Sequence, residues 1–186
     1  TDTIIVTVDD SVGPTFDLSQ TQFQFEASVD TSVNWLDYAS NLQDKSVGES
    51  TLEENDLVIY YLPGTYSVEI IGTDSYGNER KKTITVVIVD TTDPTFTTSG
   101  DLFVEINSTD FDWTTIMQDV ADNSTRDVTL TETDYVDYTI VGEYTVILTA
   151  TDPDENFTSV SITVTVQDTI SPETETLEFT FEVFDD

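Results

Sequence analysis

The chain has 186 residues, and its 38 acidic and 5 basic side chains give a formal net charge of −33. This charge excludes nucleic acids and anionic membranes as partners and favours divalent cations, a saline medium or both. Because the chain lacks cysteine and histidine, it has no disulfides, no Ser–His–Asp or Cys–His catalytic site, and no zinc or copper site built from these residues. No stretch approaches the roughly 18 apolar residues of a transmembrane helix, so direct membrane insertion is not expected.

Apolar and polar residues alternate with a period of two along most of the chain, which is typical of β-strands. In chain order, the clearest strands are expected at 23–26, 66–70, 84–89, 103–105, 144–148 and 162–166. Turn residues at 75–78 and 153–156 predict two hairpins. The segments 35–44 and 113–122 are the least strand-like, and a short helical turn is expected in each.

The sequence repeats with a period of 78 residues, so that Trp35 recurs as Trp113. The repeat predicts four parts: an extra closing strand at 1–10, a first domain at 11–90, a second domain at 91–168, and the opening strand of an incomplete third repeat at 169–186. Each linker is very short and contains a proline, which fixes φ. Linkers of this kind favour a stiff rod over flexibly joined domains.

Two segments, LPGTYSV at 62–68 and IVGEYTV at 140–146, resemble the tyrosine corner of immunoglobulin-like domains. Val68 and Val146 stand where such domains place a cysteine, so packing replaces the disulfide. With the Thr-Asp turn ending in Asn and the closing Asp-Thr-x-x-Pro, these segments are similar to the tandem bacterial immunoglobulin-like repeats of cell-surface proteins, and to hyalin-type repeats. Short strands between regular turns favour the same fold class: all-β, with two tandem immunoglobulin-like β-sandwich domains and an extra terminal strand at each end. The resemblance implies an extracellular or cell-surface location.

Acidic residues concentrate at the linkers and at the last hairpin turn of each repeat. The closing strand of one sandwich ends beside that turn of the next, so these oxygens are expected to meet at each seam, where Ca²⁺ would bridge them. The candidate ligands are Asp9, Asp10, Asp74 and Asn78 at the first seam, Asp90, Asp93, Asp152, Asp154 and Asn156 at the second, and Asp168 at the third. The alternative is that these residues only form solvated turns, which Asp and Asn favour.

Other residues support weaker hypotheses. Two carboxylates can hydrolyse a glycosidic bond, but among 38 acidic residues a close pair indicates little, and no enzyme is expected. The equivalent positions of Trp35 and Trp113 favour the core over sugar-stacking platforms. The basic cluster Arg80, Lys81 and Lys82 is expected to protect an edge strand or to contact an acidic neighbour.

The first and last predicted strands each present one apolar face, formed by Ile4, Val6 and Val8 and by Leu177, Phe179, Phe181 and Val183. A lone strand is unstable in water. Each one therefore either adds to a neighbouring copy or folds back onto its own domain. The preferred hypothesis is a structural subunit of an extracellular filament or surface fibre, a head-to-tail homopolymer joined by strand addition and stiffened by calcium. One alternative is a rigid stalk between neighbouring immunoglobulin-like repeats of an adhesin, which binds its host ligand elsewhere. The other is a spacer or polysaccharide-binding module of a secreted hydrolase.

Overall fold

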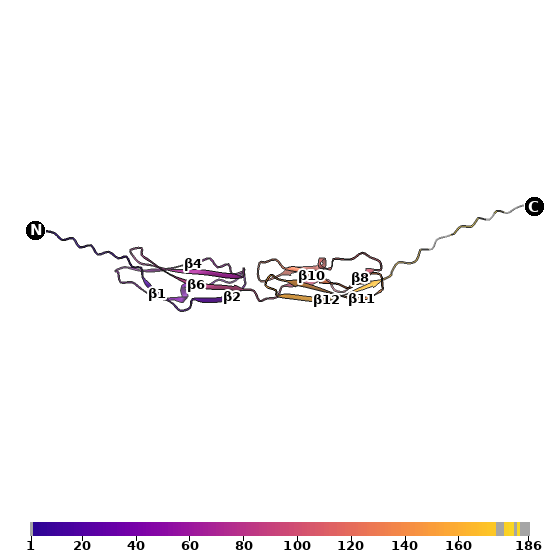
Figure 1. Cartoon of the computed structure of the whole chain (residues 1–186), viewed down its shortest axis with the longest axis horizontal. Helices are drawn as coiled ribbons and strands as arrows, with labels where there is room; N and C mark the ends of the chain where they lie inside the picture. The colour runs from indigo at the N-terminus through magenta and orange to yellow at the C-terminus, as the bar shows by residue number, and fades with distance from the viewer. Residues whose placement is uncertain (1, 174–176, 181, 183–186) are drawn as a thin grey trace, which may run out of the picture.

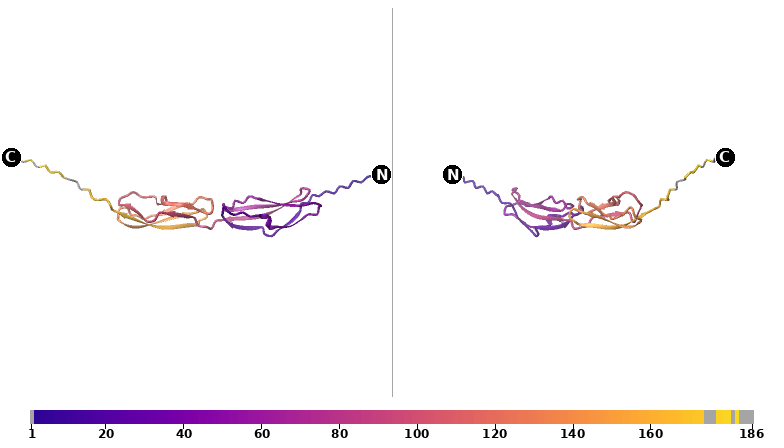
Figure 2. Two further views of the ribbon diagram at one scale, coloured as in Figure 1. Left: turned by 180° about the vertical axis from the view of Figure 1, so that it is seen from behind. Right: turned by 45° about the vertical axis from the view of Figure 1, so that its right-hand side comes forward.

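The computed structural model describes residues 2–173, 177–180 and 182, and it contains two β-sandwiches that lie end to end (Figure 1). The same end-to-end arrangement is visible from behind and after a 45° turn (Figure 2). The predicted fold class, two tandem immunoglobulin-like sandwiches, is confirmed. Within the described residues, no helix has the length and apolar character needed to cross a membrane.

The first domain comprises β1 (Thr15–Leu18), β2 (Gln22–Glu26), the 3₁₀ helix η1 (Trp35–Tyr38), β3 (Ala39–Gln43), β4 (Thr51–Asp56), β5 (Gly64–Thr73) and β6 (Glu79–Val89). One sheet has the order β2-β6-β5-β4, and β1 pairs with β3 in the other. The expected hairpin is formed by β5 and β6, which pair antiparallel over their full lengths. In contrast, β2 runs parallel to the second half of β6, which places the ends of both strands at the same pole.

The second domain repeats this plan with β7 (Thr95–Thr98), β8 (Leu102–Glu105), η2 (Trp113–Ile116), β9 (Met117–Ala121), β10 (Thr129–Thr133), β11 (Gly142–Thr151) and β12 (Phe157–Gln167). Its large sheet has the order β8-β12-β11-β10, and β7 pairs with β9. The short helical turns expected near both tryptophans are present as η1 and η2.

Each core is built from alternate residues of the long hairpin, as the two-residue period requires. In the first domain Val68, Ile70 and Val86 are fully buried, and Phe16 covers them from the small sheet. Trp35 and Trp113 are also buried, which confirms the core prediction for both. The burial of large aromatic rings between the two sheets contributes strongly to sandwich stability.

Polar groups inside each sandwich find specific partners. Trp35 Nε1 donates to Asp56 Oδ2 at 2.9 Å, and Trp113 makes the same bond with Asp134 at 2.7 Å. The predicted tyrosine corners are confirmed, because Tyr66 Oη donates to the carbonyl of Leu62 at 2.8 Å. The matching bond of the second domain joins Tyr144 to Ile140, at 2.9 Å.

The side chains of the basic cluster contact residues of their own domain. Arg80 Nε donates to the carbonyl of Pro14 at 2.8 Å, and the ammonium of Lys82 bonds the carbonyl of Phe16 and lies 5.1 Å from the centroid of its ring. These bonds fasten the start of the small sheet to β6. Lys81 pairs with Glu79 at the surface.

The terminal segments differ from the sequence prediction. No strand is present in residues 2–14, and Ile4, Val6 and Val8 are 87%, 78% and 92% exposed. The segment does not fold back onto its own domain. The extra strand expected there is therefore absent, because a strand needs a partner for its backbone hydrogen bonds. Leu177 and Phe179 are equally exposed, whereas Phe181 and Val183 lie outside the described residues.

A candidate calcium site at the domain seam

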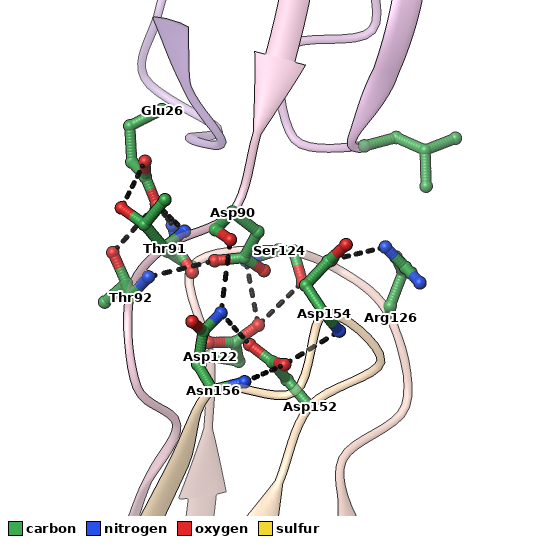
Figure 3. Close-up of polar contacts among 12 residues, drawn as sticks. Glu26, Asp90, Thr91, Thr92, Asp122, Ser124, Arg126, Asp152, Asp154 and Asn156 are labelled. Carbon is green, nitrogen blue, oxygen red and sulfur yellow. Dashed lines mark hydrogen bonds and ion pairs between the residues drawn. The ribbon is translucent and has the colours of Figure 1, made fainter.

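The seam between the domains is the short linker 90–94, whose last residue, the buried Pro94, directly precedes β7. Glu26, at the end of β2, holds this linker: its Oε1 accepts from Thr91 N at 2.7 Å and its Oε2 from Thr91 Oγ1 at 3.0 Å. Asn123 of the second domain donates to Glu26 Oε1 at 3.2 Å and to the carbonyl of Ala27 at 3.0 Å. Burial raises the pKa of Glu26, but these bonds and a further one from Thr92 Oγ1 outweigh it, so that the pKa lies below its ordinary value. Glu26 is therefore an ionised clasp that contacts both sides of the seam (Figure 3).

Three carboxylates converge behind this clasp. Asp90 follows β6 of the first domain, while Asp122 follows β9 and Asp152 follows β11 of the second. One oxygen from each lies within 4.8 Å of the others. Calcium binds oxygen at about 2.3–2.6 Å, so oxygens on opposite sides of one ion lie up to about 5 Å apart. The spacing of the three carboxylates therefore matches a single bridging calcium ion.

Two oxygens of this cluster are buried without a hydrogen-bond donor in the described structure, Asp90 Oδ2 and Asp122 Oδ1. Asp90 is only 7% exposed. A buried carboxylate oxygen is costly unless it is paired or coordinates a metal. These orphan oxygens therefore favour the predicted cation site over the alternative that the residues only form turns.

The third carboxylate is rigidly positioned by its own turn. Asp152 Oδ1 accepts from the backbone nitrogens of Asp154 at 2.8 Å and Asn156 at 2.9 Å. Asn156 Nδ2 donates to Asp152 Oδ2 at 2.7 Å and to the carbonyl of Asp90 at 3.2 Å. The Asn156 amide group thus ties the turn of the second domain to the end of the first.

The electrostatics of the cluster favour cation binding. Burial raises the pKa of Asp90, and the negative charges of Asp122 and Asp152 raise it further, while hydrogen bonds from Ser124 and Thr92 oppose the rise. Two carboxylates at this separation repel by on the order of 3 kcal/mol at an effective dielectric constant of about 20. A divalent cation would turn this repulsion between the domains into attraction.

The remaining residues predicted for this seam lie around the cluster. The carboxylate of Asp154 pairs with Arg126 across a partly exposed surface, so its charge is already compensated. Asp93 is exposed and accepts from the backbone nitrogen of Phe157 at 3.2 Å. Asp168, the counterpart of Asp90 at the far end of the second domain, is exposed and accepts from Ile170 N at 3.2 Å.

A second cluster of the same construction lies at the opposite pole of the first domain. Oxygens of Asp10, Asp44 and Asp74 lie within 4.8 Å of one another. Asn78 Nδ2 donates to Asp74 Oδ2 at 2.9 Å and to the carbonyl of Asp10 at 3.1 Å. Asp9 is exposed beside this cluster. The two poles therefore share one design, although among the described residues buried carboxylate oxygens without a hydrogen-bond donor occur only at the internal seam.

Asp44 and Asp122 are the residues that the sequence prediction missed. They are one repeat apart and each directly follows a short strand of the small sheet. Their recurrence in register was the available signal. The ligand roles of all these residues remain predictions.

Comparisons with solved structures give low overall similarity. The chain is 11% identical to human mucin-like protocadherin EC1-2, with a TM-score of 0.40 and coverage of 83% of this chain and 98% of that one. It is 15% identical to human protocadherin-24 EC1-2, with a TM-score of 0.35 and coverage of 86% and 100%. Against Drosophila N-cadherin EC1-4 the identity is 13%, the TM-score 0.32 and the coverage 83% and 50%. No protein-family model matches the chain, and no curated protein sequence does so significantly.

Proposed function

We propose that this chain is a structural segment of an extracellular rod, in which calcium fastens consecutive immunoglobulin-like domains. The observation that carries the proposal is the pair of orphan oxygens, Asp90 Oδ2 from one domain and Asp122 Oδ1 from the other, beside Asp152. An ion at this position holds ligands from both domains and resists bending at the seam. The small number of protein ligands favours a weak site of about 10⁻⁴–10⁻³ M, the range typical of extracellular modules. Such a site fills only where calcium is millimolar, which supports a location outside the cell.

The proposal is tested by the distribution of distances between the domains. Glu53 and Thr131 are exposed, occupy equivalent positions and can be replaced by cysteines in a chain that has none. Spin labels on these two sites report the interdomain distance by pulsed electron resonance. We expect a broad distribution in chelator and a narrow one in millimolar calcium. In millimolar magnesium the distribution of interdomain distances should stay broad, because magnesium requires a tighter, octahedral shell of ligands.

Asp122→Asn is the matched variant for this experiment, because it removes one ligand without changing the linker. Its distance distribution should have the same width in calcium as in chelator. Equal widths in chelator and in calcium for the native sequence would contradict the proposal. So would a narrowing by calcium in Asp122→Asn as large as that of the native sequence.

A filament subunit joined by strand addition is a second candidate, favoured by the exposed alternating side chains of residues 4–8. Ile4, Val6 and Val8 offer an apolar face together with unpaired backbone groups, which is the requirement for adding a strand to another sheet. Light scattering in calcium distinguishes this candidate from a simple rod segment. Filament assembly predicts growth of large species that Val6→Lys abolishes. A monomer of constant mass would exclude it.

A further inference from the structure

The first domain has a free pole, opposite the seam, whose surface differs from that of the second domain in a coordinated way. The second domain meets the seam with Asn123, Thr125 and the Arg126–Asp154 ion pair. The equivalent positions of the first domain carry Lys45, Val47, Gly48 and Tyr76. Both members of the ion pair are thus replaced together. Val47 is 91% and Tyr76 63% exposed.

The backbone at this pole is nevertheless built for a seam. Asp44 Oδ2 accepts from Ser46 N at 3.2 Å, as Asp122 Oδ2 accepts from Ser124 N at 3.3 Å. The adjacent residue, Lys45 in one case and Asn123 in the other, therefore stands at the same place relative to its domain. Lys45 makes no ion pair within the described part of the chain.

The far pole of the second domain is built like the pole that the first domain presents to the internal seam. Glu105 Oε1 accepts from Thr169 N at 2.8 Å and its Oε2 from Thr169 Oγ1 at 2.7 Å, which reproduces the grip of Glu26 on Thr91. These bonds lower the pKa of Glu105, so that it is ionised at neutral pH. Ile140 and Val141, which directly precede β11 at the same pole, are 58% and 56% exposed.

We propose that the free pole of the first domain docks onto an immunoglobulin-like domain whose facing pole is built like that of the second domain. In the internal seam Asn123 contacts Glu26; in the proposed seam, Lys45 takes the place of Asn123 and faces the carboxylate at the position of Glu105. The proposal rests on the rod function above. It adds a prediction of the surface of the neighbouring domain, which should present a carboxylate and exposed apolar side chains at the same pole.

The apolar part of the contact follows from the same correspondence between equivalent positions of the two domains. In the internal seam, Arg126 and Asp154 line one hollow with Pro63 and Gly64 of the first domain. The same relation brings Tyr76 against the position of Val141. An apolar contact and a complementary charge replace a solvated ion pair, so the poles of the two domains are distinct and prefer different neighbours. This difference makes the pair of domains, rather than the single domain, the repeating unit.

The test joins two copies of the chain so that Asp168 of the first is followed directly by Ser11 of the second. This fusion keeps the register, because Asp10, Asp90 and Asp168 occupy equivalent positions. Thr125 N bonds the carbonyl of Tyr61 across the internal seam at 3.3 Å. The corresponding cysteine pair in the new seam is Thr139→Cys in the first copy and Val47→Cys in the second. Disulfide formation between them reports docking.

The expected rate of disulfide formation is within threefold of that for Tyr61→Cys with Thr125→Cys in the native chain. A pair that joins Thr139→Cys to Thr65→Cys of the second copy, at the opposite pole, supplies the background rate. Lys45→Glu in the second copy should slow trapping roughly two- to fivefold, the range of an exposed ion pair. The same charge change at Lys81, which pairs within its own strand, should have no effect.

The proposal would be overturned if the disulfide formed no faster than in the background pair. It would also be overturned if Lys45→Glu left the rate of disulfide formation unchanged. Tryptophan fluorescence shows whether the fusion folds. If it does not fold, residues 91–168 are inserted after Asp10 of the single chain, which creates the same junction. The test can fail separately from the test of the rod function, which measures the effect of calcium at the internal seam. Narrowing by calcium there, together with background trapping here, would refute this proposal alone.

Discussion

Replacement of Asp122 by asparagine should separate the repulsive role of the carboxylate cluster from its role in calcium binding. Asp122 lies within 4.8 Å of both Asp90 and Asp152, so the substitution removes two of the three repulsive pairs. In chelator, the variant should therefore be more stable than the native protein.

Calcium should reduce this difference, because it stabilises mainly the native protein. For a dissociation constant of about 0.1–1 mM, roughly 2 mM free calcium stabilises the native protein by about 0.6–1.8 kcal/mol. In domains of this size 1 kcal/mol shifts Tm by about 4–8 °C, so the expected rise is roughly 3–14 °C. Asp122→Asn should lose most of this rise.

Differential scanning calorimetry in chelator and in calcium measures both effects. Asp127→Asn is the matched control, because Asp127 is exposed in the same loop and lies outside the cluster. A calcium response that survives in Asp122→Asn would refute the reasoning. An equal loss in Asp127→Asn would do the same, because it would attribute the response to general charge screening.

Three further predictions concern the clasp and the two cores. The folded pKa of Glu26 lies below the ordinary 4.5, so its carboxylate should stabilise the seam above pH 4.5 and lose this contribution as the pH falls through the lowered value. The difference in stability between the native protein and Glu26→Gln should therefore vanish in acid. A difference that stays constant with pH would contradict this prediction. Tyr66→Phe removes the bond to Leu62 and should lower Tm by about 4–8 °C, for a loss of about 1 kcal/mol; an unchanged thermal melt would exclude a stabilising corner. Trp113→Phe deprives Asp134 of its donor and should cost about 1–3 kcal/mol in denaturant unfolding, which Asp134→Asn should partly restore.

Local patterns in the sequence predicted the sandwich because its elements depend on nearby residues. Strand alternation has a period of two, and the residues that form a hairpin turn are adjacent. The tyrosine corner joins residues four apart, such as Tyr66 and Leu62. The 78-residue repeat then doubled each signal, and it placed Trp35 and Trp113 in equivalent cores. The strand predicted at 1–10 was wrong for residues 2–10, because a strand needs a pairing partner that a local pattern does not specify. The strand predicted at 169–186 lies partly outside the described residues.

The sequence by itself therefore determined the two sandwiches, their cores and the acidic character of the seams. Only the tertiary structure decided which carboxylates meet. Asp122 is 30 residues from Asp152 and 32 from Asp90, and it joins them because β6 of the first domain and β9 and β11 of the second all end at the seam. In the same way the structure assigned Asp154 to Arg126 rather than to the cluster. Oxygens that converge from three strands have no fixed sequence spacing, since the packing of the strands and not the length of the loops sets their distance.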